Sequence, residues 1–156
     1  MVKRLLLTSV AVFLFPYFCF AEFIGPVVSV LDGDTIEVLR NNRAERIRLS
    51  GIDCPEKGQA YGQKAKHAAS VLVFGEEVTL QTYGKDKYGR TLADVILPDG
   101  TYANHTLVKD GWCWWYRKYA PGDTTLERLE TEAREAQRGL WADPDPVPPW
   151  EWRKRK

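Results

Sequence analysis

The stretch VVSVLDGDTIEVLRNNRAERIRL, residues 27–49, alternates apolar and polar side chains with a period of two. Ile36 and Val38 are typical of this pattern, since both are apolar and the charged Glu37 lies between them. Asp-Gly-Asp at 32–34 and Asn-Asn at 41–42 interrupt the alternation with residue types that favour turns. The stretch therefore predicts a meander of three strands, because short alternating runs bounded by turn residues are the usual strand signal.

Changes in periodicity predict the remaining elements. We expect a helix over 61–72, strands over 78–83 and 90–97, a short helix over 103–109, an aromatic strand over 112–119 and an amphipathic helix over 124–139. Five strands with a helix inserted after the third fit a small closed barrel of the oligonucleotide-binding (OB) type. The expected class is α+β, mainly β, with about three helices; a generic α+β sheet is the alternative.

The N-terminus reads MVKRLLLTSVAVFLFPYFCFA, with two cations followed by an apolar run and a small-residue end. This pattern is that of a secretory signal peptide, residues 1–21, cleaved after Ala21. An uncleaved membrane anchor is the alternative. The apolar run is short for a bilayer span, however, and Pro16 interrupts it.

Cleavage would leave one compact domain over 22–143 and a Pro-rich, basic tail over 144–156, which reads as an extended strap or a flexible, solvated end. We expect the product to be a monomer, exported to the periplasm or the medium, with no stable membrane association. Loss of the two cations of the signal takes the formal charge from +1 to −1. Any polyanion must therefore be bound by local placement of charge, because no global basic field attracts it.

Two cysteines, Cys54 and Cys113, remain outside the signal peptide. An exported compartment permits disulfides. We therefore hypothesise a Cys54–Cys113 bridge, with two free thiols as the alternative.

Charged residues collect around two turns. Asp34 begins a strand after the Asp-Gly-Asp turn, and Asp53 lies just past the end of another strand. Two neighbouring carboxylates repel unless a cation or a proton relieves them, and hard oxygen ligands of this kind suit Ca²⁺ or Mg²⁺. Two unrelated turn aspartates are the simpler interpretation, because Asp favours turns.

Two arginines and a glutamate accompany these aspartates. Arg48 lies on the polar face of its strand and Arg90 opens a later strand, while Glu56 follows Asp-Cys-Pro. A guanidinium can bind phosphate oxygens in bidentate fashion, and a carboxylate near the nucleophile can act as a general base. Surface solvation is the alternative for the arginines, and an exposed acid near a helix N-terminus is the alternative for Glu56.

The blocks VLDGDT, RLSGIDCPE and DKYGR, taken in order, resemble the three signature blocks of the staphylococcal (thermo)nuclease family. The resemblance covers residues 27–143, since NHTLVKDGWCWWYRKYAP and EAREAQRGLWAD are similar to later segments of that family. It implies an OB-fold barrel that hydrolyses phosphodiester bonds of DNA and RNA with Ca²⁺, leaving 3′-phosphate and 5′-hydroxyl ends.

The resemblance also implies a role for each residue of the blocks. Asp34 and Asp53 would ligate Ca²⁺ together with the backbone carbonyl of Cys54, where the family usually has Thr or Ala. Asp32 would lie behind these ligands. Arg48 and Arg90 would bind the phosphate, Glu56 would be the base, and Lys87 and Tyr88 would contact a second phosphate. Tyr119, or alternatively Tyr116, would lie near the nucleobase.

A non-catalytic nucleic-acid-binding barrel is the rival function. Such a module is expected to lose Glu56, one of the aspartates or an arginine, and this chain keeps them all. Phosphate contacts carry no information on the sequence of the nucleic acid.

Overall fold

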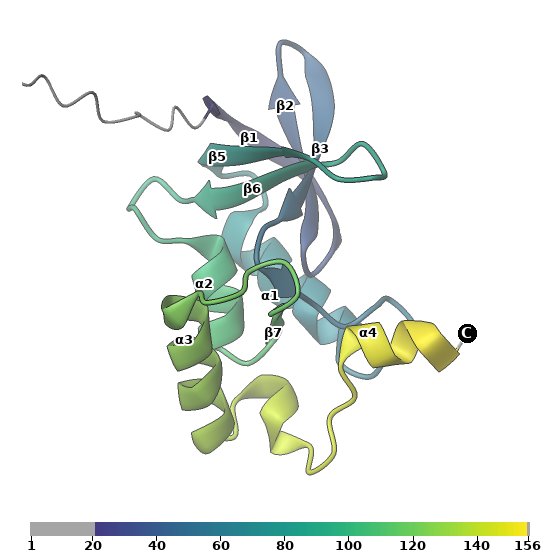
Figure 1. The fold of residues 1–156 in the computed structure, drawn as a ribbon. Coiled ribbons are helices and arrows are strands. Elements are labelled where there is room, and N and C mark those ends of the chain that lie inside the picture. Colours follow the sequence, from purple (N-terminus) through teal and green to yellow (C-terminus); the bar gives the residue numbers. More distant parts are fainter. Residues whose placement is uncertain (1–20, 156) are drawn as a thin grey trace, which may run out of the picture.

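The computed structural model describes residues 21–155, which form a five-stranded closed barrel with helices gathered at one end (Figure 1). The barrel strands are β1 (Ala21–Asp32), β2 (Thr35–Arg40), β3 (Arg43–Leu49), β5 (Glu77–Lys85) and β6 (Thr91–Ile96). Their order is β1-β2-β3-β6-β5, and β5 pairs back onto β1. The predicted OB-type barrel is thereby confirmed, and the generic α+β sheet is excluded.

The alternation of the opening stretch fills the barrel. Ile36, Val38 and Ile47 are fully buried, and they meet buried residues of β5 and β6 such as Leu80 and Val95. At the tip of β2 and β3, Asn41 and Asn42 take φ values of 49° and 60°. A two-residue hairpin turn of this hand needs positive φ at both positions, and asparagine tolerates it better than most residues.

Helices close one end of the barrel. The helical elements are α1 (Gly62–Val73), α2 (Ala103–Lys109), α3 (Thr124–Glu135), the one-turn α4 (Pro149–Trp152) and the 3-10 turns Gly139–Ala142 and Arg153–Arg155. α2 has the predicted bounds. α3 is capped by Asp123, whose side chain accepts a hydrogen bond of 2.9 Å from the Leu126 amide.

The predicted end of α3 at 139 is wrong by four residues. Gln137 takes a left-handed φ of 52°, and the Arg138 amide donates to the Ala133 carbonyl at 2.9 Å. These features form a Schellman-type helix end. The chain therefore turns before it reaches the glycine at 139.

The predicted aromatic strand over 112–119 is also much shorter than expected. Only β7 (Trp114–Trp115) is strand, and it pairs with the equally short β4 (Ile52–Asp53) in a separate two-stranded sheet. Cys54 and Cys113, which follow and precede these strands, form a disulfide in the structure. The bridge joins the turn that carries Asp53 to the aromatic segment.

The C-terminal tail packs on the domain as a strap, and is not a free end. Trp141 lies edge-on to Trp114 with ring centroids 4.3 Å apart, and Trp150 does so at 5.5 Å. The side chain of Gln59 donates a hydrogen bond of 2.6 Å to the Val147 carbonyl. These contacts bring α4 back beside the N-terminal end of α1 (Figure 1).

The predicted signal peptide falls on residues 1–20, outside the described residues, and on Ala21. Within residues 21–155, every helix is too short or too polar to cross a bilayer.

Replacing both cysteines with alanine should lower the free energy of unfolding by about 2–4 kcal/mol, because the bridge closes a long loop of the unfolded chain. Its 59-residue separation is large enough for this loss to exceed that of most surface changes. Urea unfolding of the oxidised protein and of the double variant measures the difference. Equal midpoints and slopes would contradict it.

Candidate active site

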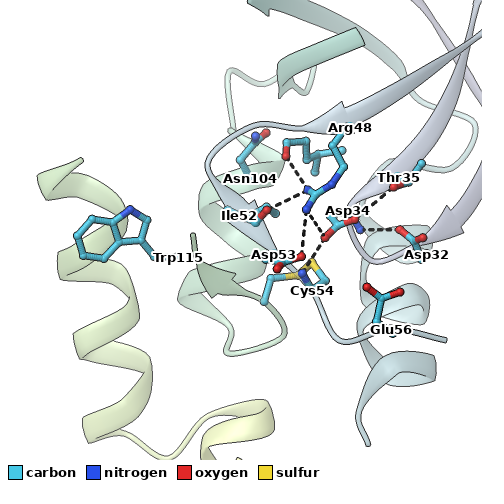
Figure 2. The surroundings of a disulfide bond; sticks show 12 residues. Asp32, Asp34, Thr35, Arg48, Ile52, Asp53, Cys54, Glu56, Asn104 and Trp115 are labelled. Carbon is cyan, nitrogen blue, oxygen red and sulfur yellow. Dashed lines mark hydrogen bonds and ion pairs between the residues drawn. A yellow bond between two sulfur atoms is a disulfide. The ribbon is translucent and has the colours of Figure 1, made fainter. Parts of the chain in front are cut away.

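Two buried carboxylates meet at one guanidinium. Nη2 of Arg48 lies 3.1 Å from Asp34 Oδ2 and 3.1 Å from Asp53 Oδ1 (Figure 2). Asp34 comes from the β1–β2 turn and is 6% exposed, and Asp53 ends β4 and is 1% exposed. The pairing of β2 with β3, in which Thr35 faces Arg48, places the turn and the arginine side by side.

Arg48 is held by backbone as well as by acids. Its Nη1 donates hydrogen bonds of 2.9 Å to the carbonyls of Leu49 and Ile52. Its side chain is only 13% exposed, so the solvated interpretation of this arginine is wrong. The guanidinium is therefore fixed at the point where the chain passes from β3 into β4.

Arg90 reaches the same cluster through a threonine. Its Nη1 lies 3.5 Å from Thr35 Oγ1, which donates at 3.2 Å to Asp34 Oδ1. On its other side, Nε of Arg90 donates to Asp86 Oδ2 at 2.7 Å. The carboxylate of Asp86 also accepts from the amides of Tyr88 and Arg90, so it shapes the loop that presents the arginine.

The residues expected to contact nucleotide lie at the rim. Tyr88 is 72% exposed, and its ring centroid lies 5.0 Å from the Lys87 ammonium and 5.4 Å from the Arg90 guanidinium. Tyr119 is 69% exposed, and it meets the half-buried Tyr116 edge-on at 4.9 Å. Tyr116 is fixed by its amide, which donates to the Gly51 carbonyl at 2.8 Å.

Glu56 is joined to the cluster by a residue of the tail. Arg153 Nη1 lies 2.7 Å from Glu56 Oε1, and its Nη2 lies 2.7 Å from Asp53 Oδ2. Arg153 is therefore paired with both acids, although its side chain stays partly solvated, as expected of the basic end. The five expected residues of the site (Asp34, Arg48, Asp53, Glu56 and Arg90) are thus connected by direct contacts or through a single intervening side chain.

Cys54 and Asp32 complete the surroundings of the carboxylates. The Cys54 amide donates to Asp34 Oδ2 at 2.7 Å, and Asp32 accepts from the Asp34 amide at 3.3 Å. Gly33, between the two aspartates, has no room for a side chain, because a Cβ there would come within 2.8 Å of Cys54 Cβ and 3.0 Å of Ala65 Cβ. The turn can therefore pack closely against the disulfide.

Crowding of acids perturbs their protonation. Burial, with the neighbouring charge of Asp34, raises the pKa of Asp32 to about 6. Burial also raises the pKa of Asp53, although the hydrogen bond from Arg153 and the charge of Arg48 oppose the shift. Binding of a cation would stabilise the ionised form of these carboxylates, because they are already removed from water.

The carboxylates of Asp34 and Asp53 are hard ligands of the kind Ca²⁺ prefers. Among residues 21–155, no group of three or more His, Cys, Asp or Glu side chains is placed to hold a metal ion. A cation held here would therefore take two side-chain carboxylates, with backbone oxygen and water completing its shell. Ca²⁺ accepts such mixed oxygen shells.

Sequence comparison agrees with this geometry. The profile of the family described as "Staphylococcal nuclease homologue" matches residues 46–143. The chain belongs to this family. The matched region includes β4 to β7, α1 to α3 and four of the five clustered residues, Arg48, Asp53, Glu56 and Arg90.

Bacterial and plant members of the family are similar over most of the chain or over its core. An "Uncharacterized endonuclease" of Escherichia coli O157:H7 is 48% identical over 145 residues, 93% of this chain and 94% of that protein. A "Micrococcal nuclease" of Shigella flexneri is 43% identical, covering 86% of this chain and 82% of that protein. The "Staphylococcal-like nuclease CAN1" of Arabidopsis thaliana is 40% identical, covering 71% of this chain and 34% of that protein.

Three contributors to the site were not predicted from the sequence. Thr35 and Asp86 lie within the quoted blocks VLDGDT and DKYGR. Their polar side chains, close in sequence to Asp34 and Arg90, could have indicated that they contact these residues. Arg153 lies 100 residues from Asp53, and the sequence around it carries no sign of that contact.

Asp32→Asn should stabilise the protein at pH 8, measured with a chelator present, by as much as about 3 kcal/mol. The folded pKa of Asp32 lies above its ordinary 3.8, so the stability it contributes is complete below about pH 4 and is lost as pH rises through about 6. Asparagine stays neutral throughout. Urea unfolding from pH 4 to 8 should show curves that coincide near pH 4, separate between about pH 4 and 6, and run parallel above 6.

The exposed Glu135, changed to Gln, controls for the loss of one carboxylate. A gap between Asp32→Asn and wild type that is constant with pH would contradict the assignment.

Proposed function

We propose that the chain is an exported, calcium-dependent nuclease that hydrolyses phosphodiester bonds of DNA and RNA within the strand and from its ends, leaving 3′-phosphate and 5′-hydroxyl ends. One observation carries the proposal: Asp34 and Asp53 share the Arg48 guanidinium, and Glu56 and Arg90 border the same cluster. Family membership supports nuclease activity, and the cluster supplies the groups that such chemistry needs.

Asp34 and Asp53 would hold Ca²⁺, with the backbone carbonyl of Cys54. The ion would supply positive charge beside the scissile phosphate, where negative charge grows during attack. The two acids suit this role because both are buried and neither lies on an exposed surface loop. The cross-link at Cys54 further restricts the segment that follows Asp53.

The two arginines act on the phosphate itself. Arg90 is the more available, because the hydrogen bonds of its guanidinium are one from Nε to Asp86 and one long contact to Thr35. Arg48 is committed to two carbonyls and two acids, so its main contribution is a fixed charge that also aligns Asp34 and Asp53. Guanidiniums arranged in advance stabilise the transition state without reorganising during the reaction.

Glu56 would take a proton from the attacking water. It lies at the edge of the cluster and is partly exposed, so water reaches it. Tyr88 with Lys87 would contact the neighbouring phosphate, and Tyr116 or Tyr119 would pack against the base. Aromatic faces accept any base, which suits an enzyme without sequence preference.

The remaining features concern export. We propose that residues 1–21 are a cleaved signal peptide, that 22–143 form the nuclease domain and 144–156 its tail, and that the product works as a monomer in the periplasm or the medium. The disulfide between Cys54 and Cys113 supports this location, because such bonds persist in oxidising compartments.

Glu56→Gln and Arg90→Ala should each lower the rate of plasmid and RNA degradation in Ca²⁺ by at least about a hundredfold, because each removes a group that acts on the reacting phosphate. The matched changes Glu127→Gln and Arg128→Ala remove the same charges from the exposed face of α3 and should leave the rate unchanged. Gel assays of initial rates measure all four.

Chelation should abolish cutting, and Asp53→Asn should abolish Ca²⁺ binding measured by calorimetry. Undiminished cutting in a chelator would refute the calcium assignment. Retained binding of DNA without cutting, in any divalent cation, would favour the non-catalytic module.

A further inference from the structure

The C-terminal segment, residues 147–153, lies across the candidate active site. We call it the strap. Its first anchor is the hydrogen bond of 2.6 Å from Gln59 Nε2 to the Val147 carbonyl, and its last is Arg153 on Asp53 and Glu56. Between them, Pro149 begins the single turn α4 and is buried.

Arg153 occupies the acidic groups that the proposed reaction requires. Its two terminal nitrogens contact both oxygens of Asp53, at 3.3 and 2.7 Å, and Nη1 also contacts Glu56 at 2.7 Å. A carboxylate in a bidentate pair with a guanidinium has its lone pairs directed at that partner. Asp53 Oδ2 is therefore occupied by Arg153 in this structure.

Trp150 covers the aromatic side of the site. Its ring stacks on Tyr116 with centroids 5.4 Å apart and an interplanar angle of 3°. A parallel aromatic stack on this face is the contact that a nucleobase would make in the proposed function. The strap thus places a cation at the proposed metal ligands and a flat ring at the proposed base platform.

The charged end of the strap is held by contacts that solvent weakens. The Arg153 side chain is 41% exposed, and ion pairs with that much solvent access contribute little. α4 spans four residues, too few for a helix that is stable by itself. Ca²⁺ brings two positive charges to the carboxylates of Asp53 and Glu56, where Arg153 brings one.

We propose that the strap is an autoinhibitory element, in which Arg153 and Trp150 take the places of the divalent cation and the nucleobase until both displace it. This inference rests on the proposed function, because it assigns Asp53 to the cation and Tyr116 to the base. The tail thereby regulates the enzyme, since the nuclease is restrained when Ca²⁺ or substrate is scarce and is released when both are abundant.

The decisive measurement is Ca²⁺ affinity, by titration calorimetry of the purified protein at low ionic strength. Arg153→Gln should bind Ca²⁺ about three- to tenfold more tightly than wild type, the range expected when a half-exposed competing ion pair is removed. Arg153→Lys should fall between the two, because it keeps the charge but loses the bidentate contact.

Arg155→Gln is the matched control. Arg155 lies two residues further along the same tail, is exposed and forms no ion pair with any residue from 21 to 155. Its variant removes the same charge, so it should bind Ca²⁺ as wild type does. An equal gain in both variants would assign the effect to net charge and overturn the proposal.

Two further outcomes separate this inference from the proposed function. If wild type binds Ca²⁺ and cuts DNA while Arg153→Gln shows unchanged or weaker affinity, the strap does not inhibit and the nuclease assignment stands. If neither protein binds Ca²⁺, the proposed function fails and the strap proposal falls with it.

Movement of the strap has its own readout. With 5-fluorotryptophan incorporated, the ¹⁹F resonance assigned through Trp150→Phe should shift when Ca²⁺ and a phosphorothioate oligonucleotide are added together. A Trp150 resonance that stays unchanged at saturating concentrations of both would show that the ring never leaves Tyr116, and it would overturn displacement.

Discussion

The site depends on one guanidinium placed between two acids. Arg48 contacts Asp34 and Asp53 through a single nitrogen, and its other terminal nitrogen binds the carbonyls of Leu49 and Ile52. Without this charge the two buried carboxylates would repel each other, and leaving one uncompensated in the interior would destabilise the fold. The contact therefore has two effects: it allows acids to gather at the barrel end, and it fixes how far apart they lie. The hairpin of β2 and β3 carries the arginine, and the turn into β4 carries the carbonyls and the Asp53 carboxylate that it contacts.

Local patterns predicted the barrel well because they depend on neighbours along the chain. Alternation of apolar residues and the Asn41-Asn42 turn specify β2 and β3, and a capping aspartate begins α3. The three charged blocks likewise lie within short stretches, so a resemblance in sequence was enough to identify residues that the fold brings together. Their convergence needed the closed barrel, in which β3 and β6 pair in parallel and bring Arg90 toward Thr35.

The errors share a different origin, which is contact between distant parts of the chain. A strand needs a partner strand, and β4 offers only two residues for pairing. The aromatic run has the composition of a strand, but only Trp114 and Trp115 are therefore paired as one. The tail reads as an extended strap or a flexible end because prolines and charges dominate it, and the sequence does not decide between the two. Its order comes from Trp114, Tyr116 and Gln59, none of which is near it in sequence. Periodicity carries no information about such partners.

The disulfide has a mechanical consequence for the site. β4 and β7 are two residues each, and a pair so short would separate readily in thermal motion. The bond between Cys54 and Cys113 joins their flanks covalently, so it limits how far Asp53 on one side and Tyr116 on the other can separate. Under the proposed function, this restraint would keep the tyrosine at a constant distance from the acids, and so would fix the spacing between the groups that bind the two ends of a nucleotide.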